Sequence, residues 1–343
     1  MRYNIKRIKI GGGVMEKRCF FVMLILFVFL AAGCGKQSGE TKAQPPKLVV
    51  YCTMSSPLIE SLVNEFEKQY DVRVDLIAGD AVYYPEDAGE ADVFMGIAPA
   101  LAEENPAKFR LYSSENAQEI LSEFRRIEDS VTTFAAGSTV LLVNTNLAGD
   151  IPVTGYRDLL RPELAGQVTM PNPAFSATGC RHLLNILATS PNEDDGWLFV
   201  RRLLGNRLMR PVASATEAAS AVADGRATVA MTTEAAALTE ILAGSPVRMV
   251  YMREGILTYE LGVSIATLTP YHKEAENFVD FLTSRSTQFV LARQFHFRPV
   301  HKSLTEADAA DKKRPVVSPV NAETRRRILD RFAAYAAAAE AEP

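Results

Sequence analysis

The sequence predicts an α/β protein with mostly parallel sheets. Short runs of β-branched and apolar residues alternate along the chain with segments whose apolar residues recur at helical spacing, a pattern typical of strand–helix–strand units. The chain has 343 residues, 48% of them apolar and 23% charged. This is the composition of an ordinary globular protein, and the length is sufficient for two lobes with separate cores.

The predicted elements follow one another from Lys47 onward. The strands cover residues 47–53, 71–79, 91–96, 132–146, 167–173, 210–213, 227–232 and 261–267. The first helix begins at Pro57 with Ser56 as its N-cap, because apolar residues recur at helical spacing through Phe66. The remaining helices cover residues 158–166, 175–188, 195–204, 214–224, a segment ending at 243, 273–283, 286–294 and an Ala-rich C-terminal segment.

The first 33 residues have the pattern of an export signal. Residues 19–30 form an apolar run of 12 residues, too short to cross a bilayer comfortably, which takes about 20 residues. Lys17 and Arg18 precede this run and small residues follow it, as in a cleavable signal peptide. The segment LAAGC, which ends at Cys34, resembles a bacterial lipobox and implies a lipid attached to Cys34. The alternative is a plain secretory signal with a chance cysteine.

Removal of this signal peptide changes the charge and the cysteine content of the chain. Residues 1–33 carry six Lys/Arg and one Glu, so the formal charge falls from −4 to −9. Nucleic acid is therefore excluded as a partner, since binding it needs a basic face. Residues 34–46 are expected to be a flexible, lipid-anchored tether. Cys52 and Cys180 remain in the folded part, and both a single disulfide and two buried free thiols stay open.

Catalytic signatures are absent from the sequence. The histidines at 182, 272, 296 and 301 form no HExxH spacing, and no GxSxG elbow or P-loop occurs. We therefore predict a protein that is not an enzyme, has no catalytic residues and needs no cofactor or metal. His182 is expected to be a surface imidazole, and Trp197 is expected to lie in the core.

Four segments resemble the type 2 periplasmic solute-binding proteins of ABC transporters, in the branch with ferric-ion, thiamine, polyamine and aminoalkylphosphonate receptors. They are LVVYCTMSSPLIESLVNEFEKQY, GEADVFMG, TVLLVNTNLAGDIPVTGYRDLLRPELAGQVTMPNPAFSATG and VYMREGILTYELGVSIATLTPYHKEAENFVDFL. The resemblance implies a two-lobed fold, each lobe a mostly parallel sheet flanked by helices. Lobe 1 would comprise residues 47–133 and 255–303, and lobe 2 residues 134–254 and 304–343. A solute would lie in the hinge cleft and favour closure.

Candidate ligand contacts lie after strands and at helix starts, where N–H groups point outward. They are Ser55, Ser56, Asp80, Ser138, Thr139, Ser176, Thr178, Gly179, Thr232, Thr233, Glu234 and Glu260. The segment FSATG combines hydroxyls and amides with the positive end of a helix dipole, which favours an anion, although a simple N-cap is the alternative. Glu234 and Glu260 are expected to be solvated; if either lined the cleft, it would favour an ammonium group.

The resemblance implies an exported, monomeric receptor, held at the membrane by lipidated Cys34, that passes a small-molecule or inorganic ligand to ABC permease and ATPase subunits. Ferric receptors use a His, a Glu and adjacent tyrosines where this chain has Ser55, Ile97 and the segment MTTEAAA. An oxyanion-bearing ligand such as a phosphonate is therefore favoured over iron. The alternatives are a metal-ion, polyamine or thiamine receptor of the same fold, and a ligand-presenting module for a membrane sensor.

Overall fold

The computed structural model describes residues 45–54, 57–79, 84–85, 88–205, 209–304 and 322–341. The strands are β1 Lys47–Cys52, β2 Arg73–Ala78, β3 Val93–Ile97, β4 Thr132–Asn144, β5 Val168–Pro171, β6 Met209–Val212, β7 Val229–Thr233, β8 Val247–Val250, β9 Thr258–Ile265 and β10 Arg298–Pro299. The helices are α1 Pro57–Tyr70, α2 Pro99–Glu103, α3 Thr145–Ala148, α4 Ala177–Thr189, α5 Glu193–Gly205, α6 Ala215–Ala223, α7 Glu234–Leu242, α8 His272–Thr283, α9 Arg285–Gln294 and α10 Ala322–Ala341. The predicted signal peptide, Cys34, Ser55, Ser56 and Asp80 lie outside the described residues.

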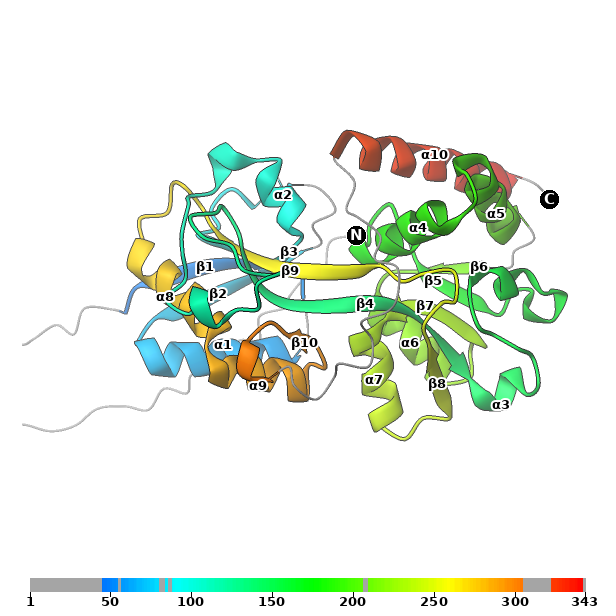
Figure 1. The fold of residues 1–343 in the computed structure, drawn as a ribbon, viewed down its shortest axis with the longest axis horizontal. Coiled ribbons are helices and arrows are strands. Elements are labelled where there is room, and N and C mark those ends of the chain that lie inside the picture. Colours follow the sequence, from blue (N-terminus) through cyan, green and yellow to red (C-terminus); the bar gives the residue numbers. More distant parts are fainter. Residues whose placement is uncertain are drawn as a thin grey trace, which may run out of the picture. The chain divides into compact units, whose positions relative to one another are not determined.

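The described strands form one mixed sheet (Figure 1). Its order is β2-β1-β3-β9-β4-β7-β5-β6, and β8 and β10 pair with β4. The pairs of β1 with β2 and β3, and of β5 with β6 and β7, are parallel. Every antiparallel pair involves β4 or β9. The α/β class is confirmed, and within it the strand pairing is mixed.

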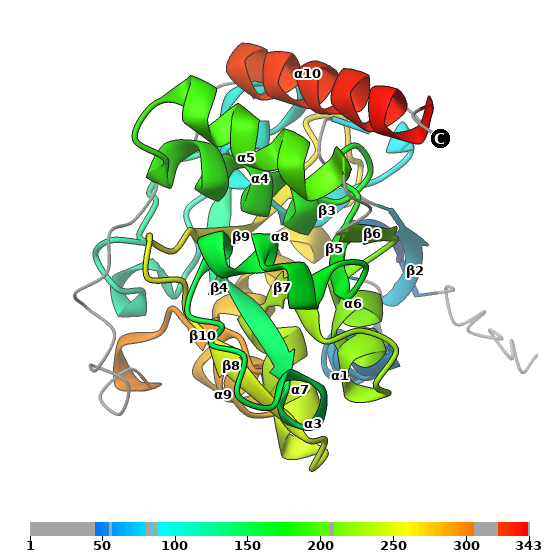
Figure 2. The same cartoon turned by 90° about the vertical axis from the view of Figure 1, so that its right-hand side faces the viewer.

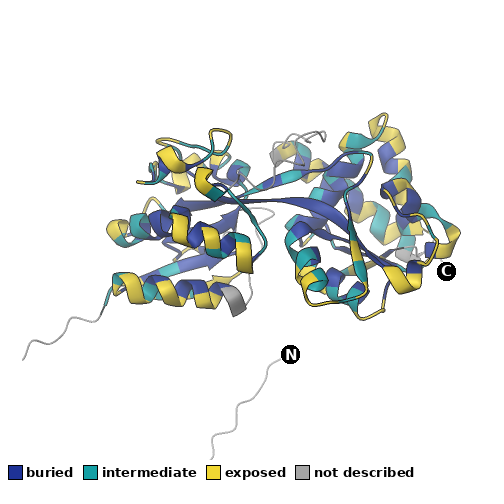
Figure 3. Cartoon of the chain, turned by 60° about the horizontal axis from the view of Figure 1, so that its bottom comes forward, coloured by how far each residue is buried: buried dark blue, intermediate teal, exposed yellow. Residues whose placement is uncertain are grey.

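Strand β4 belongs to two halves of this sheet. Its residues 132–138 pair with β9 and β10, and with β1, β2 and β3 these strands form what we call the first half. Its residues 139–144 pair with β7 and β8, and with β5 and β6 these form the second half. All of β4 is buried, and Figure 3 shows the buried crossing strand between helices whose outer faces are exposed.

Each half carries a hydrophobic cluster on each face of the sheet. In the first half, Phe66 lies in the cluster under α1, α8 and α9, and Phe94 lies in the cluster beside α2. In the second half, Trp197 lies in the cluster under α4, α5 and α10, which confirms its predicted place in the core, and alanines of α6 and α7 fill the other cluster. Successive side chains of β4 point to opposite faces of the sheet, so Leu141 and Leu142 lie in clusters on opposite faces.

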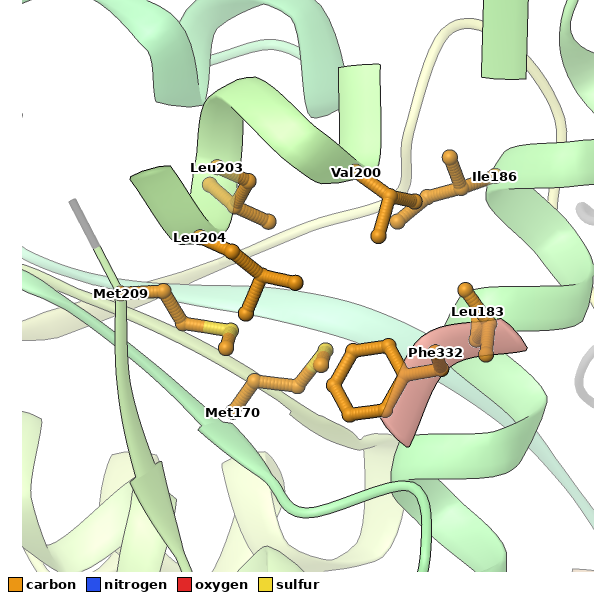
Figure 4. A pocket seen from close by; sticks show the side chains of 8 residues that line it. All are labelled: Met170, Leu183, Ile186, Val200, Leu203, Leu204, Met209 and Phe332. Atoms are coloured by element: carbon orange, nitrogen blue, oxygen red, sulfur yellow. The ribbon is translucent and has the colours of Figure 1, made fainter. Parts of the chain in front are cut away.

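Helix α10 covers the second half of the sheet beside α4 and α5 (Figure 2). Its Phe332 borders a small void lined only by apolar side chains (Figure 4), and its Tyr335 packs edge-on against Trp197, with 5.5 Å between ring centroids. Its first turn reaches the first half, because Nη2 of Arg325 lies 2.7 Å from Oε2 of Glu104, which ends α2. Helix α10 therefore contacts both halves.

The local structure differs from the prediction at several elements, since α2, α3, β8 and β10 are not predicted from the sequence. Residues 158–166 do not form one helix but two 3-10 turns, η4 Tyr156–Leu160 and η5 Pro162–Leu164. Arg161 between them is extended, with φ −64° and ψ 135°, as expected for a residue before proline. Strand β9 begins at Thr258 rather than at 261, which brings Tyr259 into the sheet beside β4.

The chain crosses between the halves later than residue 134, the expected start of lobe 2. Phe134 packs in the first-half cluster, and β4 pairs with β9 through Ser138. On the return path, Ile256 packs in the second-half cluster and Leu257 in the first. The crossings therefore lie at 138–139 and at 256–257.

Truncation of Phe332 tests whether α10 is an integral part of the second half. Phe332 is almost completely buried, so we expect Phe332→Ala to lower the free energy of unfolding by about 3 kcal/mol, because a cavity replaces the ring. Urea denaturation measures this change. Phe289→Ala on α9 is the control, since the Phe289 side chain is 50% exposed and its truncation should change stability by less than about 1 kcal/mol. Equal effects of the two changes would contradict the packing role of α10.

Candidate functional site

Polar residues from both halves meet where β4 crosses between them. Ser138 pairs with Thr258 on one edge of β4, and Thr139 pairs with Thr233 on the other. Ser138 and Thr139 are fully buried. The Ser138 and Thr258 hydroxyl oxygens lie 3.4 Å apart, and the Thr139 amide donates to the Leu257 carbonyl at 3.0 Å. These two predicted contacts are therefore enclosed by neighbouring strands rather than exposed to a solute.

The start of α4 combines buried hydroxyls with outward-pointing amides. Ser176 occupies the N-cap position with φ −125° and ψ 124°, but its side chain makes no capping hydrogen bond. Ser176 is 5% exposed and Thr178 is 8% exposed, and the first-turn amides have no acceptor within the helix. Gly179 has a packing role, since a Cβ there would lie 2.1 Å from the Pro171 carbonyl oxygen. The helix start thus offers donors that the helix itself does not use.

The two hydroxyls at the end of β7 are engaged locally. The Thr232 hydroxyl donates to the carbonyl of Ala215 at 2.7 Å, which directs it toward α6. The Thr233 hydroxyl caps α7 by accepting from the amide of Ala236 at 3.3 Å. Both side chains therefore stabilise the end of the strand and the start of the helix.

Glu234 is buried in an ion pair, so the expectation that it is solvated is wrong. The residue is 8% exposed. Arg298 donates to both of its carboxylate oxygens, from Nε at 2.8 Å and from Nη2 at 3.1 Å, and the Tyr251 hydroxyl donates to Oε1. Burial alone would lower the pKa of Arg298, but the bonds to Glu234 and its charge outweigh burial and raise that pKa. Because β10 lies in the first half, this pair joins the two halves.

Glu260 belongs to a separate polar group in the first half. It is half-buried rather than solvated. Oε2 of its carboxylate accepts from the Thr133 hydroxyl at 2.5 Å and lies 3.6 Å from Nη2 of Arg126. Successive residues of a strand point to opposite faces of the sheet, so Glu260 and Tyr259 face opposite ways. The fold does not bring Glu260 together with Glu234.

Tyr259 lies between the two halves at the crossing. It is 7% exposed, and the guanidinium carbon of Arg181, on α4, lies 4.0 Å from its ring centroid. Gly137 makes room for the ring, since a Cβ there would lie 2.6 Å from Cζ and Oη of Tyr259. Burial raises the pKa of Tyr259; Arg181 opposes that rise, and Glu234 adds to it.

His182 is fully buried, so the predicted surface imidazole is wrong. Its Nε2 lies 2.9 Å from the Thr232 carbonyl oxygen and its Nδ1 lies 2.8 Å from the Tyr156 hydroxyl. A carbonyl only accepts, so Nε2 carries the proton and Nδ1 accepts from Tyr156. Asn185 donates to the Tyr156 oxygen at 3.0 Å. This chain of bonds fixes α4 against the end of β7.

Three residues at the crossing escape prediction from the sequence: Arg181, Tyr251 and Arg298. Arg181 could have been found, because it follows Thr178 by three positions and so lies on the same helix face. No local signal marks the other two. Tyr251 follows β8 and Arg298 lies on β10. Both strands pair with β4, which also pairs with β7, the strand that ends just before Glu234.

Two observations on the described residues concern metal ligands and thiols. Within it, no group of three or more His, Cys, Asp or Glu side chains could hold a metal ion. Cys52 and Cys180 are buried in clusters of different halves and form no disulfide with each other, and burial raises the pKa of Cys52 to about 11.

The described helices include none that is both long and apolar enough to span a bilayer.

Comparison with known proteins identifies similar chains. The family model for bacterial extracellular solute-binding proteins matches residues 48–298. A protein of Haemophilus influenzae, itself uncharacterized, is 26% identical over 282 residues, which cover 77% of this chain and 80% of that protein.

Two solved structures are similar over nearly their whole length. A two-component system protein that mediates signal transduction is 28% identical with a TM-score of 0.71, covering 83% of this chain and 99% of that chain. The periplasmic binding protein AfuA from Actinobacillus pleuropneumoniae, solved with fructose-6-phosphate bound, is 21% identical with a TM-score of 0.77, covering 85% and 99%. The fold is that of a two-lobed periplasmic binding protein.

The buried state of His182 predicts a loss of stability in acid. Burial lowers the pKa of His182 from 6.5 to about 4, so as the pH falls the unfolded chain takes up the proton first. The stabilisation is complete above pH 6.5 and is lost progressively toward pH 4, on the order of 3 kcal/mol for this residue. His296 and His301 also have lowered pKa values and add to the same trend. Urea denaturation across this pH range measures the loss.

A matched pair of variants isolates the contribution of His182. We expect His182→Gln to be less stable at pH 7 and to show a shallower pH dependence, because the buried neutral imidazole is gone. His272→Gln, at an exposed position on α8, should keep the slope of the parent protein. An unchanged slope in His182→Gln would contradict the assignment.

Proposed function

We propose, because this chain belongs to the bacterial extracellular solute-binding proteins, that it captures a small solute outside the cytoplasm and delivers it to an ABC importer. The members of this family bind solutes rather than transform them. The proposal includes export by the signal peptide at residues 1–33 and attachment of lipid at Cys34, with the permease and ATPase subunits of the importer as partners.

Capture would proceed by closure of the two lobes over the solute. We assign lobe 1 to residues 47–138 and 257–303, and lobe 2 to residues 139–256 with the C-terminal helix. The position of the crossings at 138–139 and 256–257 supports this division. A solute drives closure only as far as it binds the closed state better than the open one.

The favoured ligand carries an oxyanion, such as a phosphonate or an organic phosphate. The observation that carries this choice is the start of α4, where the Ser176 side chain makes no capping bond although the residue is buried. The Ser176 and Thr178 hydroxyls and the first-turn amides lie together at the positive end of the helix dipole. An anion there would satisfy donors that the helix leaves unused.

A cationic ligand is less well supported. Glu234 follows Thr233, which pairs with Thr139 at the crossing, and Arg298 donates to both of its carboxylate oxygens. A polyamine or thiamine would have to compete with that guanidinium for the same oxygens. Ferric ion requires anionic oxygen ligands, and the carboxylate of Glu234 is already bound by Arg298.

The second candidate function is a ligand-presenting module for a membrane sensor. The similarity to a two-component system protein that mediates signal transduction, 28% identical, supports it. The fold and the solute would be the same in both cases, and the difference lies in the membrane protein that contacts the closed lobes.

The start of α4 yields a test of the ligand class. Three oxyanion-bearing probes are tested: inorganic phosphate, 2-aminoethylphosphonate and fructose 6-phosphate. We expect at least one of them to raise the melting temperature of the mature protein. Ser176→Ala should weaken binding of that probe about tenfold, because a hydroxyl bond to a charged group is lost. The same change should leave the melting temperature without probe almost unaltered, since Ser176 does not cap its helix. Calorimetric titration and thermal melting measure the two effects.

Ser214→Ala provides the matched control. Ser214 caps α6 by accepting from the Glu217 amide, so its loss should lower stability by about 1 kcal/mol and leave probe binding unchanged. Binding of spermidine, thiamine or ferric ion with no response to any oxyanion would refute the ligand class. If Ser176→Ala lost stability but bound the probe as tightly as the parent protein, Ser176 would have a structural role and would not contact the ligand.

The partner decides between transport and sensing. We expect permease and ATPase genes beside the gene for this chain, and loss of uptake of the bound solute when that gene is deleted, because an ABC importer depends on its receptor. A neighbouring membrane kinase, with unchanged uptake and loss of the transcriptional response to the solute, would instead favour the sensor.

A further inference from the structure

Helix α10 is fixed to the second half of the sheet. Ile328, Leu329 and Phe332 of this helix pack in the cluster under α4 and α5. The guanidinium carbon of Arg331 lies 4.6 Å from the centroid of the Trp197 ring on α5, within the range of a cation–π contact. These contacts cover the length of the helix, so α10 moves with the second half as one body.

Glu104 is fixed to the first half. It is the C-cap of α2, and its amide donates to the carbonyl of Ala100 at 3.0 Å. Leu101 and Ala102 of the same helix pack in the cluster that contains Phe94 of β3. The carboxylate of Glu104 is therefore carried by an element that moves with the first half.

An ion pair connects these two elements. Nη2 of Arg325, in the first turn of α10, lies 2.7 Å from Oε2 of Glu104, and the two side chains are only 11% and 21% exposed. The second carboxylate oxygen, Oε1, is buried and accepts no hydrogen bond from a described residue. Compensation of the Glu104 charge thus depends on Arg325, and separation of the two groups would leave a mostly buried charge uncompensated.

The position of this pair makes it sensitive to rotation of the halves. The chain crosses between the halves at 138–139 and 256–257, and a rotation about these segments displaces a group in proportion to its distance from them. Figure 1 shows α2 and α10 outside the sheet, on the same side of β4 and β9. The pair of Glu234 with Arg298 lies beside the crossing, so the same rotation moves it less.

We propose that Glu104 and Arg325 form a latch that sets the equilibrium between different orientations of the two halves. The latch stabilises the orientation in this structure, and a hinge rotation of the halves has to break it. A hydrogen-bonded ion pair suits this role, because its hydrogen bond is lost once the two atoms are more than about 3.5 Å apart. The latch goes beyond the proposed function, since it concerns the conformational equilibrium and not the class of solute.

The distance between two spin labels tests the latch in the mature protein without any solute. Labels on Lys273→Cys in α8 and Arg202→Cys in α5, both exposed positions, report the separation of the halves. We expect one peak with the parent latch and a second peak with Glu104→Gln, because loss of the pair shifts the equilibrium about tenfold toward other orientations. The double change Glu104→Arg with Arg325→Glu re-forms the pair with exchanged charges and should restore the single peak.

Trp197 reports whether α10 stays packed in these variants. It is the one tryptophan of the chain, and Arg331 and Tyr335 of α10 contact its ring. Its fluorescence emission should be the same in Glu104→Gln as in the parent protein. A shifted emission would overturn the latch, because the ion pair would then hold α10 on the second half instead of linking the halves.

Glu276→Gln is the matched control. Oε1 of Glu276, on α8, lies 3.1 Å from Nη1 of Arg110, and the Glu276 side chain is 21% exposed, as is that of Glu104. The amide of Arg110 donates to the carbonyl of Ile265 on β9, so both partners belong to the first half. We expect the distance distribution of this variant to equal that of the parent protein.

Two further controls concern labelling and folding. The chain without added cysteines corrects for any label on Cys52 and Cys180, which are buried. Circular dichroism checks that each variant is folded. Arg325→Gln removes the other partner of the latch and replaces Glu104→Gln, with the same expected result, if that variant does not fold.

The outcomes separate this inference from the proposed function. A single, unshifted peak in Glu104→Gln overturns the latch and leaves the capture of a solute untouched. A second peak that the exchange of charges does not remove also overturns it, since the effect would then not depend on the ion pair. Solute probes play no part in the measurement, so a protein that bound none of them would overturn the proposed function alone.

Discussion

Strand β4 is buried along its whole length and has to satisfy its backbone hydrogen bonds in two halves of one sheet. It does so by pairing with β9 and β10 up to Ser138 and with β7 and β8 from Thr139 onward. The residues at the change of partners are small, because side chains from both halves converge there. The residues assembled around Tyr259, from Arg181 to Glu234, are brought together by this one crossing.

Two ion pairs join the halves and limit how they can move. Glu234 binds Arg298 near the crossing, and Glu104 binds Arg325 where α10 meets α2. Breaking a buried pair leaves uncompensated charges and is costly. In a receptor that closes on its ligand, any change in these contacts contributes to the free-energy difference between the open and closed states. The ligand shifts the equilibrium between these states by binding the closed state more tightly than the open one.

Most of the helices and buried strands could be predicted from the sequence because their signals are local. The predicted helix 214–224 is α6, whose N-cap Ser214 accepts from the amide of Glu217. The prediction failed where a proline interrupts an apolar pattern, at Pro162, and where a short strand is stabilised only by its neighbours, as in β8 and β10. Burial of His182 was missed for a similar reason, since its partners Tyr156 and Thr232 are distant in the sequence.

The sequence by itself determined the α/β class, the order of most elements and the helix start at Ser176, because periodicity, caps and turn residues act over a few positions. Only the tertiary structure decided which polar groups near the crossing are already engaged. Glu234 is neutralised by Arg298, Thr232 bonds to α6, and Arg181 stacks on Tyr259. These pairings depend on how β4 brings remote segments to its two edges, and no local pattern encodes that proximity.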